Sequence, residues 1–279
     1  MNEPVRETIP LAGGAVSTLT WNGNGPLLHF AHANGFNAET YRGLLAPLSG
    51  AFRVVASDAR GHGRTTLPAT PGLARNWTIF RDDLIAILDR IAPNGAILAG
   101  HSMGATASMM ATALRPEKVR ALVLVEPVLM PQGVGPGDNE LARRAEKRRD
   151  AFVSLDEAFT LYRGRGAFKT WPDDMLRDYL SGGLEQIEEG LRLSCRPAWE
   201  AEDFRSTPSG VSSLARSLRC PVTLIHAKSG TASESEVAIF KQLYPATRVV
   251  LHPDATHFLP MEFPQLVRDE IRKIAPPDA

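Results

Sequence analysis

One pentapeptide constrains the fold of this chain more than any other feature. Residues 100–104 read G-H-S-M-G, and they stand between a short apolar run at 96–99 and an alanine- and methionine-rich stretch at 103–114. The run is a predicted strand and the stretch a predicted helix, so Ser102 lies on a strand-to-helix turn that only small flanking residues allow. Such a turn exposes the serine hydroxyl at a helix N-terminus, where the helix dipole favours developing negative charge. A glycine-rich turn with an N-cap serine is the alternative, because G-x-S-x-G also occurs by chance.

Short β-rich runs alternate with amphipathic stretches at both ends of the chain. A hairpin is expected over residues 9–21, around Gly13-Gly14. Further strands are predicted at 27–33, 52–57, 96–99, 121–125, 221–227 and 248–251, and helices at 76–91, 103–114, 234–244 and 265–274. This alternation is typical of an α/β fold in which helices cover a mostly parallel central β-sheet.

The alternation stops between residues 129 and 218. This segment is charged, helical in texture and rich in aromatic residues, and no buried strand is predicted in it. We therefore expect a core domain formed by residues 1–128 and 219–279, with residues 129–218 as a helical cap, or lid, inserted after the sixth strand. Insertions of this size are usually functional.

Charge and cysteine content exclude several classes of protein. The 31 basic and 31 acidic residues give a formal net charge of zero, which argues against binding to nucleic acid or to an anionic membrane. Two cysteines, Cys195 and Cys220, are too few for a disulfide scaffold or a thiolate zinc site. No histidine pair has metal-ligand spacing, so no metal is expected, and no cofactor either. Neither a signal peptide nor a membrane-spanning stretch is present, which favours a cytoplasmic protein.

Three further segments follow a recognisable order around the serine turn. N-G-F at 34–36 comes after the strand predicted at 27–33, D-A-R-G-H-G-R-T occupies 58–65, and D-A-T-H-F occupies 254–258. Together with G-H-S-M-G these segments resemble the α/β-hydrolase family, in its serine-nucleophile, esterase-like branch with a helical cap. The resemblance covers nearly the whole chain. It implies an α/β-hydrolase-type sheet, an oxyanion loop at 34–36 and a catalytic histidine in the last segment.

The resemblance also assigns chemical roles. Ser102 would be the nucleophile and His257 the general base, because a serine hydroxyl attacks poorly until an imidazole takes its proton. The backbone N–H groups of Phe36 and Met103 would form the oxyanion hole. The family usually has His-Gly where this chain has Asn34-Gly35, so the hydrogen bonds that hold the loop are expected to differ.

The acid of the triad is where the chain departs from the family pattern. The usual acid follows the strand at 222–226, but residues 227–232 contain no carboxylate. The glutamates within 233–236 are explained by a helix capping box. Glu126 ends an apolar strand at the catalytic edge of the sheet, where a buried charge needs a partner, and we favour it as the acid. A glutamate that only caps the junction with the insert is the alternative, and Asp254 is interpreted as a turn residue.

Other histidines and glycines near these motifs have simpler interpretations. His101 adjoins the nucleophile but should point away from its oxygen, so it is interpreted as a packing residue. His62 is interpreted as a structural hydrogen-bonding residue. The glycine pairs at 61–63 and 164–166 match neither a G-x-x-x-x-G-K-[ST] loop nor a G-x-G-x-x-G turn after a strand, so a nucleotide-binding module is disfavoured.

The predicted function is hydrolysis of a carboxylic ester through an acyl-enzyme. A small, uncharged and apolar ester is the expected substrate. Cleavage of a lactone, a thioester or a C–C bond, and cofactor-free perhydrolysis, stay open on the same triad, as does a ligand-binding protein with little turnover. A serine nucleophile argues against epoxide hydrolase and haloalkane dehalogenase chemistry. The candidate substrate-binding residues are His32, Asn34, Gly35, Met130, Phe168 and Trp171.

Overall fold

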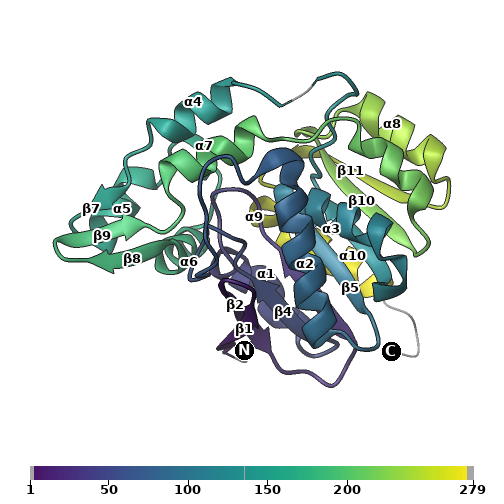
Figure 1. Cartoon of the computed structure of the whole chain (residues 1–279), viewed down its shortest axis with the longest axis horizontal. Helices are drawn as coiled ribbons and strands as arrows, with labels where there is room; N and C mark the ends of the chain where they lie inside the picture. Colours follow the sequence, from purple (N-terminus) through teal and green to yellow (C-terminus); the bar gives the residue numbers. More distant parts are fainter. Residues whose placement is uncertain (1–2, 135, 275–279) are drawn as a thin grey trace.

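The computed structural model describes residues 3–134 and 136–274, and its centre is an eight-stranded sheet (Figure 1). The strand order is β1-β2-β4-β3-β5-β6-β10-β11. Both ladders of β2, with β1 and with β4, are antiparallel, and the other ladders are parallel. The predicted α/β fold with a mostly parallel sheet is thereby confirmed. The strands are β1 Val5–Leu11, β2 Gly14–Trp21, β3 Leu27–Ala31, β4 Arg53–Ser57, β5 Ala96–His101, β6 Val119–Val125, β10 Val222–Ser229 and β11 Arg248–Thr256.

Helices cover both faces of this sheet, and the apolar side chains of each strand alternate between the two layers. Along β5, Ile97 and Ala99 join one hydrophobic cluster, whereas Leu98 joins the other. Strands buried on both faces read as continuous apolar runs, which is why the sequence identifies them. One layer contains α1 Arg42–Leu45 and α10 Pro264–Ile274; the other contains α2 Thr78–Ile91, α3 Met103–Leu114, η6 Val211–Ser217 and α8 Glu234–Leu243.

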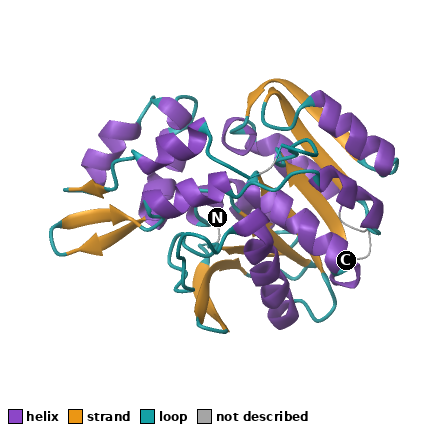
Figure 2. Cartoon of the chain, turned by 45° about the horizontal axis from the view of Figure 1, so that its top comes forward, coloured by secondary structure: helices purple, strands orange, loops and turns teal. Residues whose placement is uncertain are grey.

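The chain leaves the main sheet after β6 and returns to it at β10. We call residues 129–218 the insert, and that it acts as a separate cap domain stays a prediction. Figures 1 and 2 show its residues 140–205 to one side of the main sheet, whereas η6 packs on a face of that sheet. Besides helices it contains a three-stranded antiparallel sheet of order β7-β9-β8, which the sequence did not predict. Its elements are α4 Glu140–Glu146, β7 Ala151–Phe152, α5 Leu155–Tyr162, η5 Gly166–Phe168, α6 Asp173–Gly183, β8 Leu184–Ile187, β9 Gly190–Leu193 and α7 Pro197–Arg205.

The parallel strands bring several loops to one edge of the sheet. Their carboxyl ends meet there, so the segments after β3, β4, β5, β6 and β11 become neighbours. The shorter helical turns are η1 Glu39–Tyr41, η2 Ala46–Leu48, η3 Arg75–Trp77, η4 Pro116–Lys118 and α9 Leu259–Glu262. Among the helices that the structure describes, none is long and apolar enough to cross a bilayer.

Candidate active site

Ser102 occupies a strained turn between β5 and α3. Its φ of 54° lies in the left-handed region, which an ordinary side chain adopts only where the surrounding structure enforces it. The flanking residues 100 and 104 must be glycines, because a Cβ at either position would collide with nearby backbone. A Cβ on Gly100 would lie 2.6 Å from the Gly104 carbonyl carbon, and a Cβ on Gly104 would lie 2.2 Å from the Ala31 carbonyl oxygen. The turn directs the Ser102 hydroxyl to His257, whose Nε2 lies 3.0 Å from Oγ.

His257 follows β11 and is held by its backbone as well as by its ring. The carbonyl of His257 accepts a hydrogen bond from His101 Nε2 at 2.8 Å. One residue earlier, the N–H and hydroxyl of Thr256 both donate to the Glu262 carboxylate at 2.7 Å. The Nδ1 atom of His257 faces Glu126 Oε2 at 3.0 Å and the Thr231 hydroxyl at 3.1 Å.

Glu126 is fully buried at the end of β6, and the loop after β10 surrounds its carboxylate. The Ala227 N–H donates to Oε1 at 2.6 Å, and the Thr231 N–H donates to Oε2 at 2.8 Å. A Cβ on Gly230 would lie 2.1 Å from Oε2, so the backbone of this loop lies directly against the acid. The stretch that lacks a carboxylate of its own therefore supplies N–H donors to a carboxylate from a neighbouring strand.

The other acidic candidates lie elsewhere. Ser233 caps α8 by accepting the Glu236 N–H at 3.3 Å, which is one of the two bonds of the predicted capping box. The Glu236 carboxylate accepts the Ser212 hydroxyl at 2.6 Å, and the side chains of Glu234 and Asp254 are exposed. The structure thus brings Glu126, and none of these three, to His257 Nδ1.

The two proposed oxyanion donors differ in their present bonding. Met103 is the first residue of α3, where helix geometry leaves the N–H without an acceptor in the helix. The N–H of Phe36 donates to the Ala33 carbonyl at 3.1 Å across a tight turn. The roles of both groups in an oxyanion hole stay predictions.

His101 does more than fill space, which corrects its interpretation as a packing residue. The Ala33 N–H donates to the Tyr41 hydroxyl at 3.2 Å, and that hydroxyl lies 2.7 Å from His101 Nδ1. Burial, followed by the charge of His257, lowers the pKa of His101 well below its usual value. The neutral ring can then accept from Tyr41 and donate to the His257 carbonyl, which connects the segment after β3 to the segment after β11. A histidine in a fully buried strand was the available signal.

His32 is buried and bonded to backbone groups, and its role in substrate binding stays a prediction. Its ring is 1% exposed, with Nδ1 2.7 Å from the Ala33 carbonyl and Nε2 accepting the Ala59 N–H at 2.8 Å. Backbone groups therefore occupy both ring nitrogens. His62 has the structural role predicted for it, because its Nδ1 bonds the Arg60 carbonyl and its Nε2 accepts the Gly35 N–H at 3.0 Å.

Aromatic residues of the insert line the neighbourhood of Phe36. Trp171 packs edge-on against Phe36 at 5.2 Å between ring centroids, and against Phe258, beside His257, at 5.9 Å. Phe168 contacts Trp171 and stacks on Tyr162, one ring further from Phe36. The backbone of Met130 lies at the start of the insert and pairs with residues 209–210. Of these three predicted substrate-binding residues, only Trp171 packs against both Phe36 and Phe258.

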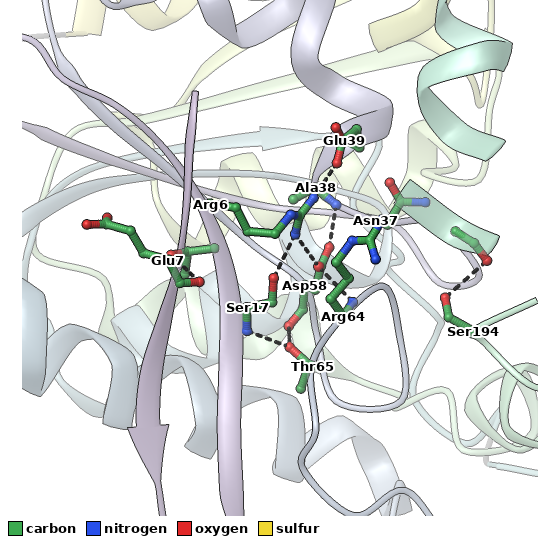
Figure 3. A network of polar contacts seen from close by, with 12 residues as sticks. Arg6, Glu7, Ser17, Asn37, Ala38, Glu39, Asp58, Arg64, Thr65 and Ser194 are labelled. Atoms are coloured by element: carbon green, nitrogen blue, oxygen red, sulfur yellow. Dashed lines mark hydrogen bonds and ion pairs between the residues drawn. The ribbon is translucent and has the colours of Figure 1, made fainter. Parts of the chain in front are cut away.

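The turn after β4 is organised by Asp58. Figure 3 shows the polar side chains and N–H groups around its carboxylate. The Ala38 N–H donates to Oδ1 at 2.8 Å, and the Arg64 N–H donates to Oδ2 at 3.0 Å. Arg6 contacts the same carboxylate at 3.3 Å, and the Thr65 hydroxyl donates to the Asp58 carbonyl at 2.6 Å. The D-x-R-G-x-G-x-[ST] motif thus ties the turn after β4 to the segment after β3. No cluster of metal-ligating side chains is found among the described residues.

Comparison with known proteins agrees with the observed fold. Residues 30–270 match the family described as the alpha/beta hydrolase family. The 2-(acetamidomethylene)succinate hydrolase of Mesorhizobium japonicum is 28% identical over 247 residues, which are 88% of this chain and 86% of that protein. A crystal structure of E-2-(acetamidomethylene)succinate hydrolase superposes with a TM-score of 0.82 and 26% identity, covering 97% of this chain and 98% of the other. A thioesterase domain from the curacin biosynthetic pathway superposes equally well, with a TM-score of 0.82 over 98% of this chain and 100% of that domain, at 18% identity.

Proposed function

This chain belongs to the alpha/beta hydrolase family, and on that premise we propose that it cleaves carboxylic esters through an acyl-enzyme formed on Ser102. The observation that carries the proposal is a continuous chain of contacts. Ser102 Oγ lies 3.0 Å from His257 Nε2, and His257 Nδ1 lies 3.0 Å from Glu126 Oε2. A serine beside an imidazole whose other nitrogen faces a buried carboxylate is the arrangement that activates a hydroxyl.

The geometry supports two half-reactions. In the first, Ser102 Oγ bonds to the acyl carbon, its proton passes to His257 Nε2, and the carbonyl electron pair moves onto oxygen. The C–O bond to the leaving group then breaks, and His257 returns the proton to the departing alkoxide. In the second, water adds to the acyl-enzyme by the same route and releases the acid and Ser102. Glu126 keeps Nδ1 protonated and stabilises the imidazolium that forms.

The oxyanion of each tetrahedral intermediate needs donors aimed at it. The Met103 N–H is available at the start of α3. The Phe36 N–H would exchange its bond to the Ala33 carbonyl for one to the oxyanion. The exchange is favourable because a hydrogen bond to a charged acceptor is about twice as strong as a neutral one. The rings of Phe36, Trp171 and Phe258 beside it suit an uncharged, apolar acyl group.

A second candidate reaction uses the same residues on an acyl–nitrogen bond. The relative that aligns over 88% of this chain is named as a hydrolase of a succinate that carries an acetamido group. A serine acyl-enzyme forms from amides as well as esters, with an amine as the leaving group. Ester and amide substrates that share an acetyl group therefore separate the two candidates.

The first experiment measures hydrolysis of p-nitrophenyl esters of graded acyl length and of p-nitroacetanilide, for the wild type and Ser102→Ala. We expect ester turnover that Ser102→Ala abolishes, with an acyl-length profile that measures the pocket. Turnover of the anilide at the higher kcat/KM would favour the amide reaction. Turnover that survives in Ser102→Ala would overturn the mechanism, and no turnover of any substrate would favour a ligand-binding role.

The second experiment tests the acid with Glu126→Gln. An amide keeps the size of the side chain but cannot stabilise the imidazolium, and the comparable change in a serine protease triad lowers kcat by about 10⁴-fold. We expect a loss of that order for ester turnover. Glu234→Gln is the matched control, since Glu234 is exposed, and it should retain wild-type activity. Equal activity of Glu126→Gln and the wild type would remove Glu126 from the triad.

A further inference from the structure

The segment between β3 and η1 is held by two parts of the molecule at once. We call residues 34–38 the β3 loop, and it contains Phe36. We propose that helices α6 and α7 of the insert position this loop through Asn34, Asn37 and Glu200, so that the insert sets the direction of the Phe36 N–H. The inference rests on the proposed function, because that N–H matters only if it stabilises an oxyanion.

Two buried asparagine amides connect the loop to the insert. The Nδ2 of Asn34 donates to the Glu200 backbone carbonyl in α7 at 3.0 Å, and the Nδ2 of Asn37 donates to the Tyr179 backbone carbonyl in α6 at 2.9 Å. Asn34 is 7% exposed and Asn37 1% exposed, so water does not compete for these bonds. The amides stand on either side of Gly35 and Phe36, and each bonds a different helix.

The Glu200 side chain adds a third contact between them. Gly35 has a φ of +74°, and a Cβ there would lie 2.6 Å from Glu200 Oε1, so the carboxylate rests against the glycine backbone. Arg148 Nη1 donates to the other carboxylate oxygen at 2.8 Å, and its remaining nitrogens reach the hydroxyls of Tyr179 and Tyr162. Glu200 therefore has a fixed position from which it limits movement of the loop toward the insert.

The turn after β4 holds the same loop through two further hydrogen bonds. The Gly35 N–H donates to His62 Nε2 at 3.0 Å, and the Ala38 N–H donates to Asp58 Oδ1 at 2.8 Å. Burial, followed by the charge of His32, lowers the pKa of His62 to about 3. The ring therefore stays a neutral acceptor at neutral pH, and loss of the insert contacts would leave the loop attached through the turn after β4 alone.

This arrangement makes Asn34, Asn37 and Glu200 positioning residues. A displacement of about 1 Å at a reacting group can lower a rate by about 100-fold, and loss of one oxyanion donor lowers kcat by about 100- to 1,000-fold. A loop that is loosened but still present should cause a smaller loss of rate than the complete loss of an oxyanion donor. We expect kcat to fall about 10- to 100-fold with KM within about 3-fold of the wild type, because the bonds act on the transition state.

The test uses Asn34→Asp and Asn37→Asp, which keep the side-chain shape and the Oδ1 acceptor but remove the Nδ2 donor. Hydrogen exchange of the Gly35 and Phe36 amides is measured together with kcat and KM on an ester. Both amides are hydrogen-bonded in the structure, so their exchange should quicken at least about 10-fold when the loop is loosened. If a buried aspartate prevents folding, Asn34→Ala and Asn37→Ala replace these variants.

Glu146→Gln is the matched control. It weakens the 2.8 Å contact between Arg205 and Glu146, which joins α7 to α4 without touching the β3 loop, and it should leave exchange and kcat unchanged. Unchanged exchange in the asparagine variants, or an equal loss of kcat in Glu146→Gln, would overturn the proposal. A loss that falls on KM alone would do the same. Hydrogen exchange needs no substrate, so it tests the positioning of the β3 loop by itself. If the wild type has no Ser102-dependent turnover, the proposed function is refuted, and the exchange rates still show whether the asparagines hold the loop.

Discussion

Two buried carboxyl groups show how far the surroundings decide what an acidic residue can do. Both oxygens of Glu126 accept backbone N–H groups, and one also faces His257. Asp203 is equally buried, yet within the described residues neither of its carboxyl oxygens has a hydrogen-bond partner. Burial, then the charges of Glu200 and Glu202, raises the pKa of Asp203 well above its usual value. The first carboxylate thus has N–H donors on both oxygens, whereas the raised pKa of the second favours its neutral form.

Asp203→Asn should therefore stabilise the protein, and more so at higher pH. Above about pH 4 the unfolded chain loses the Asp203 proton while the folded chain keeps it, so the free energy of unfolding falls as pH rises through that range. Asparagine has no such proton. The Tm of Asp203→Asn should therefore exceed that of the wild type by nearly nothing at pH 4 and by a few degrees at pH 8, since 1 kcal/mol of stability corresponds to about 2–4 °C in Tm. Thermal unfolding at both pH values measures it.

The control for this prediction is Asp254→Asn, whose carboxyl is exposed to solvent. It should shift Tm little at either pH. If the Tm of Asp203→Asn is lower than the Tm of the wild type at pH 8, the carboxyl must be ionised and stabilised by a partner that is not among the contacts described above.

At the scale of single elements, the loop after β10 lies directly against the proposed acid of the triad. Gly230 allows the loop backbone to approach Glu126, because a Cβ there would lie 2.1 Å and 2.3 Å from the two carboxylate oxygens. Gly230→Ala should push the carboxylate out of line with His257 Nδ1 and lower kcat about 100-fold, while thermal stability changes modestly. Steady-state kinetics and a melting curve test this together.

Gly50→Ala is the matched glycine control, since a Cβ there meets nothing within 4 Å. It should leave kcat unchanged. Wild-type kcat in Gly230→Ala would show that the loop does not position the acid.

The elements that the sequence predicted are those whose apolar pattern is local. The β5 strand, the α3 helix and the N-cap at Ser233 each depend on neighbouring residues, and the structure has all three. The strands β7, β8 and β9 were not predicted, because they span two to four residues and are only partly buried. The β7 strand pairs with β9 about 40 positions further along the chain, which a periodicity within one segment does not show, whereas β8 and β9 form a local hairpin whose strands have only four residues each.

The same limit applies to the candidate site. Motif order was enough to select Ser102 and His257, and the buried charge at the end of an apolar strand indicated Glu126; the structure brings the three side chains together. The supporting contacts were missed, because Asn34 meets Glu200 across 166 positions and His101 meets His257 across 156. A buried polar residue signals that a partner exists, but the partner emerges only when the whole chain is folded.

At the scale of the whole molecule, the insert and the sheet share one hydrophobic cluster. That cluster contains Phe36 and Tyr41 from the sheet side together with Trp171, Leu176 and Tyr179 from the insert. Hydrogen bonds from the β3 loop to α6 and α7 add polar contacts across the same boundary. The insert also has a small apolar cluster of its own, Ala142, Ala145 and Ala201 with Phe204, but three alanines and one partly buried ring bury too little apolar surface to keep it folded after the sheet unfolds.

We therefore expect the chain to unfold in urea as one cooperative unit. Tryptophan fluorescence and far-UV circular dichroism should give superimposable transitions, since Trp21 lies in the sheet and Trp171 in the insert. Arg148→Met should lower the free energy of unfolding by about 3 kcal/mol and so move that single transition to lower urea, because it leaves Glu200 buried without its partner. Arg149→Met removes one side of a half-exposed ion pair and should lower the free energy of unfolding by under about 1 kcal/mol. Two separate transitions, or an Arg148→Met effect seen by one probe alone, would instead show an insert that folds by itself and a lid free to move as a body over Ser102.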